Sequence, residues 1–334
     1  MWHRQVSRQL FHRCGGMPVV RWLRRKGVTI LMYHKFPADP GILESQCRYL
    51  RKHYQVISLG RLSQLLRNGD PLPDWSVVIT VDDGHGSFYR YAYPVFAKFD
   101  FPVTVYLTTR PLDTRGWLWF DRVAYAFLNS RRQEVDLPNP PSAEGMASGP
   151  RQTAHNPMAL GSRDRRLGLA EQYMELMKVV PDKYFSLCLR NLELSLGVQV
   201  PDEAPQEWAA LSWDEVRLMA RDKVEFGAHS VTHPILTHLA GKAQIEQEIR
   251  GSKDRIEAVL DRPISHFAFP NGQPQDISDQ VLQVVRDTGF QTAVTTSCGQ
   301  VHRGDNPYLL KRISCEAAMP DYQFRQHVAA FRVS

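Results

Sequence analysis

The sequence predicts an α/β fold, a closed barrel of seven or eight β-α units that carries a helical insertion. Short apolar runs recur along the chain, and segments with apolar residues at helical spacing lie between them. Repeated β-α units imply a parallel sheet, and seven or eight of them favour closure into a barrel. Aspartate and histidine residues follow several of these runs, at the end where such barrels gather their functional groups. A chain of 334 residues is long enough to form one barrel.

The apolar runs give the expected strands in chain order. Residues 77–81 read Val-Val-Ile-Thr-Val, and an unbroken run of this kind suits a parallel strand that is buried on both faces. The other expected strands are 28–33, 56–59, 103–107, 224–228, 266–269, 292–295 and 309–313. The expected helices between them are 43–53, 62–67, 89–99, 244–260, 277–288 and 321–331.

Residues at about 111–210 interrupt this alternation within the barrel domain, 27–334. The stretch 131–165 carries proline and glycine among polar residues, which predicts a flexible loop. The flanking segments 117–129 and 166–197 have leucine, methionine and tyrosine at helical spacing, which we interpret as core packing of helices. The insertion is therefore expected to form a small helical cap beside the functional end of the barrel.

Residues 1–26 are expected to form a basic helical segment, since they contain seven basic and no acidic residues. One interpretation is a solvated helix that packs on the end of the barrel. The other is peripheral contact with an anionic membrane through an apolar side formed by Trp2, Leu10, Phe11, Val20, Trp22 and Leu23. Arginines interrupt any run of signal-peptide length, and no stretch is apolar enough to span a bilayer. The expected location is cytoplasmic, or peripheral at the inner face of the membrane.

Composition narrows the class of protein further. The hydrophobic fraction of 43% and the charged fraction of 23% are ordinary for a globular chain, and the net charge is +6. Outside the N-terminal segment the basic residues are scattered without interleaved aromatic residues, so nucleic acid is not an expected partner. The five cysteines are widely spaced and form no Cys-x-x-Cys pair, which favours free thiols in a reducing compartment.

Two adjacent carboxylates, Asp82 and Asp83, follow the strand expected at 77–81. Neighbouring residues of an extended chain point to opposite sides, so one acid can hold a metal ion while the other handles a proton. His229 and His233 are four residues apart, which would put both imidazoles on one face of a helical turn. One carboxylate and two imidazoles are the usual protein ligands of a catalytic metal site. Taken separately, the Asp-Asp-Gly sequence also suits a strand-ending turn, and the histidines also suit a structural pair.

Residues 80–84, Thr-Val-Asp-Asp-Gly, and 229–234, His-Ser-Val-Thr-His-Pro, resemble the first two motifs of the NodB-homology polysaccharide deacetylases, carbohydrate esterase family 4. Residues 267–272, Phe-Ala-Phe-Pro-Asn-Gly, and 31–34, Leu-Met-Tyr-His, are similar to strand ends of the exopolysaccharide branch of that family. The resemblance covers roughly residues 27–110 and 210–315 and leaves the insertion unmatched.

This resemblance implies a distorted (β/α)7 barrel and a hydrolase of carbon–nitrogen bonds other than peptide bonds. Its expected substrate and partner is an N-acetylhexosamine polysaccharide or a lipid-linked precursor, from which it removes N-acetyl groups. Asp82 is then the general base toward a metal-activated water, and Asp83, His229 and His233 are the metal ligands. One divalent ion is expected, with zinc favoured and cobalt, nickel, iron or manganese as alternatives.

The resemblance implies His34 as the general acid. Family members carry this acid in a Leu-x-His motif, but the corresponding residues 309–313 read Leu-Leu-Lys-Arg-Ile and contain no histidine. The exopolysaccharide branch instead points to the histidine of its Leu-x-Tyr-His strand, which is His34 here. His85 and His302 are the alternative candidates.

The third family motif departs from the pattern. Ala268 stands where the family has an arginine that clamps the catalytic aspartate, and Asn271 stands where it has a tyrosine. Arg312 is expected to pair with Asp82 from the side instead. The candidate substrate and oxyanion groups are Pro270, Asn271, Gly272 and Arg312. Trp117, Trp119 and Asp121 of the insertion are candidates for stacking on a sugar or for hydrogen bonding to it.

Two alternatives follow from these departures. The unfamiliar pocket also suits a hydrolase of another non-peptide amide. A degenerate member that binds glycan within an exopolysaccharide synthesis complex is the other alternative, although a pure binder has little need for both carboxylates.

Overall fold

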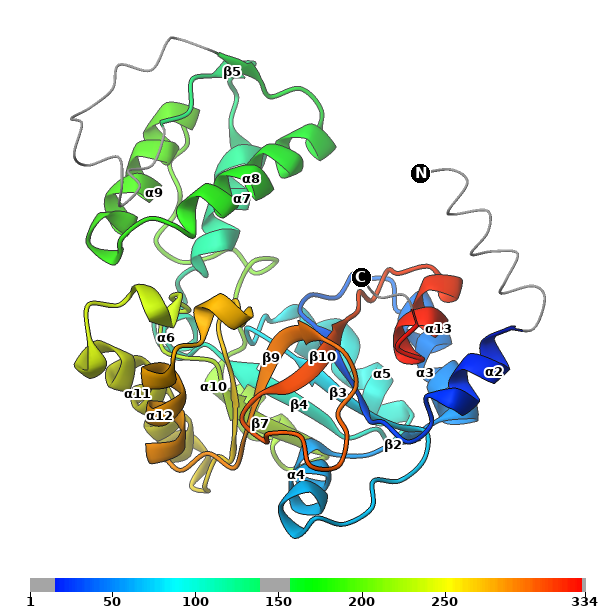
Figure 1. The fold of residues 1–334 in the computed structure, drawn as a ribbon. Helices are drawn as coiled ribbons and strands as arrows, with labels where there is room; N and C mark the ends of the chain where they lie inside the picture. The colour runs from blue at the N-terminus through cyan, green and yellow to red at the C-terminus, as the bar shows by residue number, and fades with distance from the viewer. Residues whose placement is uncertain (1–15, 139–156, 332–334) are drawn as a thin grey trace.

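The computed structural model describes residues 16–138 and 157–331. Within them, seven parallel strands close into the predicted barrel, with helices around it (Figure 1). Around the ring the strands are β1 (Thr29–Tyr33), β10 (Leu310–Ser314), β9 (Thr292–Cys298), β8 (His266–Ala268), β7 (Val224–Ala228), β4 (Val103–Leu107) and β3 (Ser76–Val81). The ring closes because β3 pairs in parallel with β1, with Tyr33 opposite Val81.

The prediction of a strand at 56–59 is wrong beyond residue 56. Strand β2 (Gln55–Val56) pairs only with the start of β3, where Gln55 lies opposite Ser76. Ser58 then caps helix α4 (Leu59–Asn68), because its side chain accepts a hydrogen bond from the Arg61 amide. An eighth barrel strand is therefore replaced by a two-residue strand and an early helix.

Alternation along the strands separates the barrel interior from the layer under the helices. One cluster of buried side chains includes Ile30, Val78, Tyr106, Val294 and Leu310, and α4 contributes leucines to it. The intervening strand residues instead pack beneath the surrounding helices. Because side chains alternate along a strand, Thr80 and Asp82 lie on the same face as Val78, and Arg312 lies on the same face as Leu310. Polar residues thus continue the inner face at the carboxyl ends of these strands.

Helices cover the barrel much as the sequence predicts. Beyond α4 they are α3 (Gly41–His53), α5 (Tyr93–Lys98), α10 (Trp213–Met219), α11 (Lys242–Leu260), α12 (Asp279–Asp287) and α13 (Asp321–Val328). Short 3-10 turns occur at η3 (Leu236–His238) and η4 (Pro274–Asp276). The helix expected at 89–99 begins instead with a π-helical turn, η1 (Phe88–Ala92), before α5.

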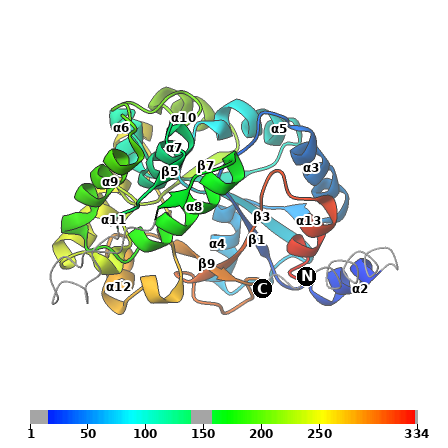
Figure 2. The same cartoon turned by 90° about the horizontal axis from the view of Figure 1, so that it is seen from above.

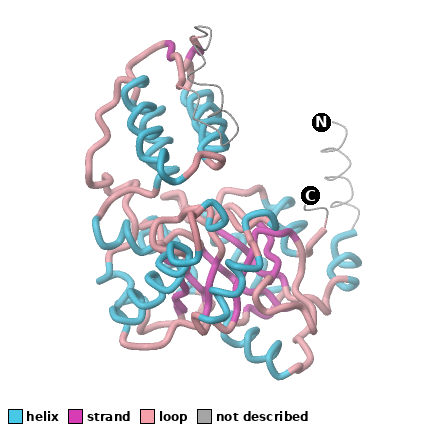
Figure 3. Tube along the Cα trace, turned by 60° about the vertical axis from the view of Figure 1, so that its left-hand side comes forward, coloured by secondary structure: helices cyan, strands magenta, loops and turns pink. Residues whose placement is uncertain are grey.

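The insertion forms a helical layer that stands on one end of the barrel (Figure 3). It contains α7 (Trp119–Asn129), β5 (Glu134–Val135), β6 (Met158–Ala159), α8 (Arg163–Met177) and α9 (Asp182–Leu196), whereas α6 (Thr109–Thr114) precedes it and packs on the barrel core through Leu112. Its own core includes Phe127, Tyr173 and Leu192. Viewed from above, α7 and α8 lie in front of the barrel strands (Figure 2).

Two expectations for the insertion need correction. The helix expected at 166–197 is two helices, since Pro181 stands directly before α9. Of the loop expected at 131–165, residues 139–156 lie outside the described part, and the residues beside them pair as antiparallel strands β5 and β6.

Helix α2 (Gly16–Leu23) belongs to the basic N-terminal segment, whose residues 1–15 lie outside the described part. Met17 and Val20 pack against Ala329 and Phe331 near the end of the chain. Among the described residues, no helix is long and apolar enough to cross a bilayer.

Candidate active site

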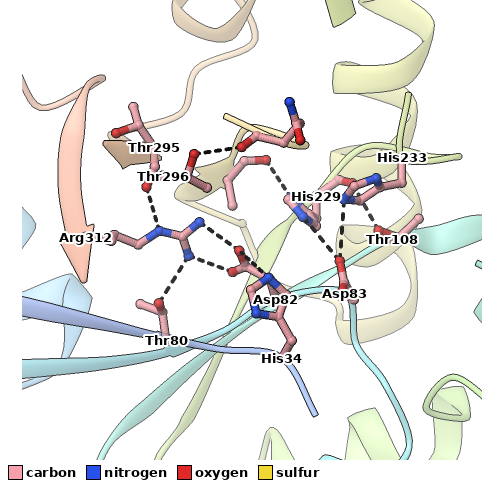
Figure 4. Close-up of polar contacts among 12 residues, drawn as sticks. His34, Thr80, Asp82, Asp83, Thr108, His229, His233, Thr295, Thr296 and Arg312 are labelled. Atoms are coloured by element: carbon pink, nitrogen blue, oxygen red, sulfur yellow. Dashed lines mark hydrogen bonds and ion pairs between the residues drawn. The ribbon is translucent and has the colours of Figure 1, made fainter. Parts of the chain in front are cut away.

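The candidate site begins at the turn that ends β3. Asp82 still bonds to the neighbouring strand, since its amide donates to the Tyr33 carbonyl over 2.9 Å. Asp83 and Gly84 both have left-handed backbones, with φ of 72° and 69°. A Cβ at position 84 would lie 2.8 Å from the Leu107 side chain, so the turn requires glycine. The turn sends the two carboxylates in different directions (Figure 4).

Asp83 lies beside both motif histidines. Its Oδ1 is 3.4 Å from His229 Nε2 and 3.5 Å from His233 Nε2. All three potential ligand atoms lie within 4.8 Å of one another. In a tetrahedral site with metal–ligand bonds of about 2.1 Å, ligand atoms are about 3.4 Å apart. The donor set and its spacing therefore fit one zinc-like ion.

Hydrogen bonding and burial prepare the two imidazoles as ligands. His229 Nδ1 donates to the Ala268 carbonyl over 2.7 Å, so Nε2 is the ring nitrogen that faces Asp83. Burial, helped by the neighbouring His229, lowers the pKa of His233 to about 4, and neutral imidazole is the form that binds metals. Burial alone would raise the pKa of Asp83, but the two histidines outweigh it and hold that pKa below its ordinary value.

The histidine pair does not lie on a helical turn, so that expectation is wrong. Both residues belong to the loop after β7, where Ser230 and His233 have φ of 64° and 61°. Ser230 Oγ accepts from the His233 amide over 3.0 Å. Glu248 of α11 accepts from the Val231 and Thr232 amides, each over 2.8 Å. Glu248 therefore shapes the loop that carries both histidines, and no sequence motif pointed to it.

Asp82 is clamped by Arg312, as the sequence predicts. Two guanidinium nitrogens each lie 2.7 Å from one carboxylate oxygen, and the side chains are 0% and 2% exposed. Arg312 Nε also donates to the Thr295 carbonyl over 2.8 Å. Burial alone would raise the pKa of Asp82, but the charges of Arg312 and His229 lower it below its ordinary value. Arg312 is thus engaged inside the barrel and is not among the residues that line the cleft.

His34 is the histidine candidate that faces Asp82. Its Nε2 lies 3.9 Å from Asp82 Oδ2, and its side chain is 45% exposed in the cleft. His85 is buried, and its Nδ1 lies 2.7 Å from Ser87 Oγ. His302 follows Val301, which pairs with Val28 at the opposite end of the barrel. Geometry therefore favours His34 over the other two candidates.

The turn after β8 holds the remaining candidates. Asn271 and Gly272 have φ of 61° and 63°. Asn271 lines the cleft, and its side-chain nitrogen donates to Asp276 over 2.6 Å. Pro270 and Gly272 do not line the cleft. Of these three candidates, only Asn271 lines the cleft.

A cleft of about 860 Å³ lies between the barrel end and the insertion. The insertion side includes Trp117, Trp119 and Phe120, and the Phe120 ring lies 5.3 Å from the His233 ring. Trp119 and Phe120 thus place aromatic surface beside the candidate metal ligands. Asp121 does not fit the expected sugar contact, since it is buried and forms an ion pair with Lys35.

Comparisons with known proteins agree with this arrangement. The family model for polysaccharide deacetylase matches residues 197–293. Poly-beta-1,6-N-acetyl-D-glucosamine N-deacetylase of Escherichia coli K12 is 39% identical over 61 residues, which are 18% of this chain and 9% of that protein. The matched segment is therefore a small part of that relative.

Solved structures of low sequence identity share the fold. The Streptococcus pyogenes deacetylase PplD, in complex with acetate, has a TM-score of 0.57 at 18% identity and covers 91% of this chain and 99% of its own. IcaB from Ammonifex degensii has a TM-score of 0.57 at 16% identity, covering 92% and 98%. As the sequence motifs predict, residues 197–293 match the polysaccharide deacetylase family model, and the fold is shared with a solved deacetylase.

Proposed function

We propose that this protein is a hydrolase that removes N-acetyl groups from an N-acetylhexosamine glycan or its lipid-linked precursor. The supporting observation is that two adjacent aspartates have different neighbours. Asp83 faces two imidazoles, whereas Asp82 faces an arginine and the exposed His34. Both acids and the three histidines beside them line one cleft that also has aromatic residues. A carbohydrate-binding protein without hydrolytic activity has no need for this second, clamped carboxylate.

Asp83, His229 and His233 would hold one divalent cation, and their mixed nitrogen and oxygen donors favour zinc among the candidate metals. When bound, such an ion polarises an amide carbonyl and lowers the pKa of water from about 15.7 to about 7.

Asp82 takes the proton of the attacking water, while the hydroxide adds to the amide carbon. The Arg312 guanidinium keeps Asp82 ionised and fixes both carboxylate oxygens. His34 then donates a proton to the leaving nitrogen as the carbon–nitrogen bond breaks. The products are acetate and the amine of a deacetylated sugar. Positioned acid and base groups of this kind contribute about 10²–10⁴-fold each.

Acetate release from N-acetylglucosamine oligomers in the presence of zinc or cobalt tests this proposal. Asp82→Asn should lower the rate by at least about 10²-fold, because the base is lost while the side-chain shape is kept. Asp305→Asn is the matched control, since Asp305 lies near His302, away from the cleft. Undiminished acetate release by Asp82→Asn would contradict the assigned base. Hydrolysis of other amides but not of N-acetylhexosamines would favour the alternative hydrolase.

We also propose that helix α2 contacts an anionic membrane. Val19, Trp22 and Leu23 are more than half exposed on this short helix, next to the basic residues 24–26. The full chain should cosediment with phosphatidylglycerol vesicles and not with phosphatidylcholine vesicles. Trp22→Glu should abolish this binding, whereas Leu218→Glu, on the exposed surface of α10, should retain it. Equal binding by both variants would argue against α2.

A further inference from the structure

Lys35 and Asp121 form an ion pair that joins the barrel to the insertion, across 86 residues of sequence. Lys35 directly follows His34, the proposed acid. Asp121 directly follows Phe120, whose ring contacts His233 of the metal centre. The pair therefore connects the two chain segments that face each other across the cleft.

Lys35 also contacts the segment by which the insertion returns to the barrel. Its ammonium lies 5.2 Å from the centre of the Trp208 ring. Just after Trp208, the Ala209 carbonyl accepts from the Gly86 amide over 2.9 Å, and the Leu211 amide donates to Gly84 over 2.8 Å. Both connections of the insertion are thus fixed beside the catalytic residues, one through Asp121 and one at the turn that carries Asp83.

The burial of Asp121 is not explained by stability. Its side chain is 3% exposed, and among the described residues Oδ2 has no hydrogen-bond partner. Burial raises the pKa of Asp121 to about 6, even though Lys35 opposes this rise. A carboxylate in such a place costs free energy. Lys35 is 41% exposed and stays solvated without its partner, so an apolar residue of similar volume at position 121 should not destabilise the fold. The acid at position 121 therefore serves position rather than stability.

We propose that Lys35 and Asp121 are positioning residues that hold the insertion over the metal centre and so set the width of the substrate cleft. Their loss lets Phe120 and Trp119 move relative to His34 and His233. Since the displaced wall contacts the substrate rather than the breaking bond, the loss falls mainly on KM.

Replacement of Asp121 separates positioning from folding. Asp121→Leu should raise KM for N-acetylglucosamine oligomers about tenfold or more, while the thermal midpoint stays the same or rises. If Asp121 had a merely structural role, its replacement would raise KM and lower the thermal midpoint together, and that result would overturn the proposal. Lys35→Met should raise KM to a similar extent. Lys35→Arg keeps the positive charge and should raise KM much less. In the double variant Lys35→Met with Asp121→Leu, the defect should not exceed that of the single variants.

The kinetic measurements rest on the proposed deacetylase function, so a second measurement does not use activity. In Asp121→Leu the amides of Gly86 and Leu211 should exchange hydrogen faster than in the unchanged chain, whereas those of β4 should not change. The control is Lys223→Met, which breaks the exposed Lys223–Asp100 pair and should alter neither exchange nor KM. A chain that releases no acetate but shows this exchange pattern would refute the deacetylase while supporting the positioning pair. Unchanged exchange of these two amides in Asp121→Leu would refute the positioning role of Lys35 and Asp121.

Discussion

Arg312 and Asp82 form a buried pair in which each charge depends on the other. Arg312→Met removes the cation and leaves the carboxylate without compensation inside the barrel, which typically costs about 3–5 kcal/mol. Urea denaturation should show this loss in the free energy of unfolding. Lys311→Met, at the exposed neighbouring position, should change the free energy by much less. Equal stability of the two variants would show that the pair is not the source of the cost.

At this scale the sequence identified most of the candidate site, because the motif residues carry chemistry in their own side chains. Asp82, Asp83, His229 and His233 come together as expected, and Arg312 occupies the role left open by Ala268. Glu248 and the Lys35–Asp121 pair could not be found this way. Their roles arise from contacts with backbone amides or with a distant segment, and charged residues on helices and loops are usually solvated.

Among the elements, α11 supports the metal site from outside the barrel. Glu248 holds the loop from His229 to His233 through the Val231 and Thr232 amides and the Thr232 hydroxyl. Glu248→Ala should lower zinc affinity by about 10–100-fold, the usual effect of removing a group that supports metal ligands. Competition with a chromogenic chelator measures this affinity. Glu246→Ala on the same helix is the matched control, since Glu246 pairs only with Lys242 among the described residues. Equal affinities would exclude this role for Glu248.

Elements were predictable where local signals and burial agree. The strands at 103–107 and 224–228 have the predicted bounds, since mainly apolar runs identify them. The exceptions have local causes. Ser58 starts a helix inside an expected strand, and Pro181 divides an expected helix. The loop at 229–234 has two histidines at helical spacing without a helix, because left-handed residues and hydrogen bonds to Glu248 define its path.

For the whole molecule, repeated β-α units were enough to predict a closed barrel, but not the number of its strands. Closure depends on the pairing of β1 with β3 rather than with β2, which is a long-range choice that no local pattern specifies. The placement of the insertion over the catalytic end could be expected only in outline. Lys35 contacts Trp208 and Asp121 of the insertion, and the types of these residues alone do not predict that they meet.

Metal binding should couple to the stability of the whole fold, because the ligands come from β3 and from the loop after β7. An ion that binds only the folded state stabilises it by about 2.7 kcal/mol when its free concentration is a hundred times its dissociation constant. Urea denaturation with buffered free zinc, compared with excess chelator, should show this increment in the unchanged chain. Asp83→Asn should lose it, since one of three ligands is weakened. Asp279→Asn, on the exposed first turn of α12, should keep it. An increment of equal size in Asp83→Asn would mean that zinc binds elsewhere, and the absence of any increment in the unchanged chain would remove the metal from the proposed chemistry.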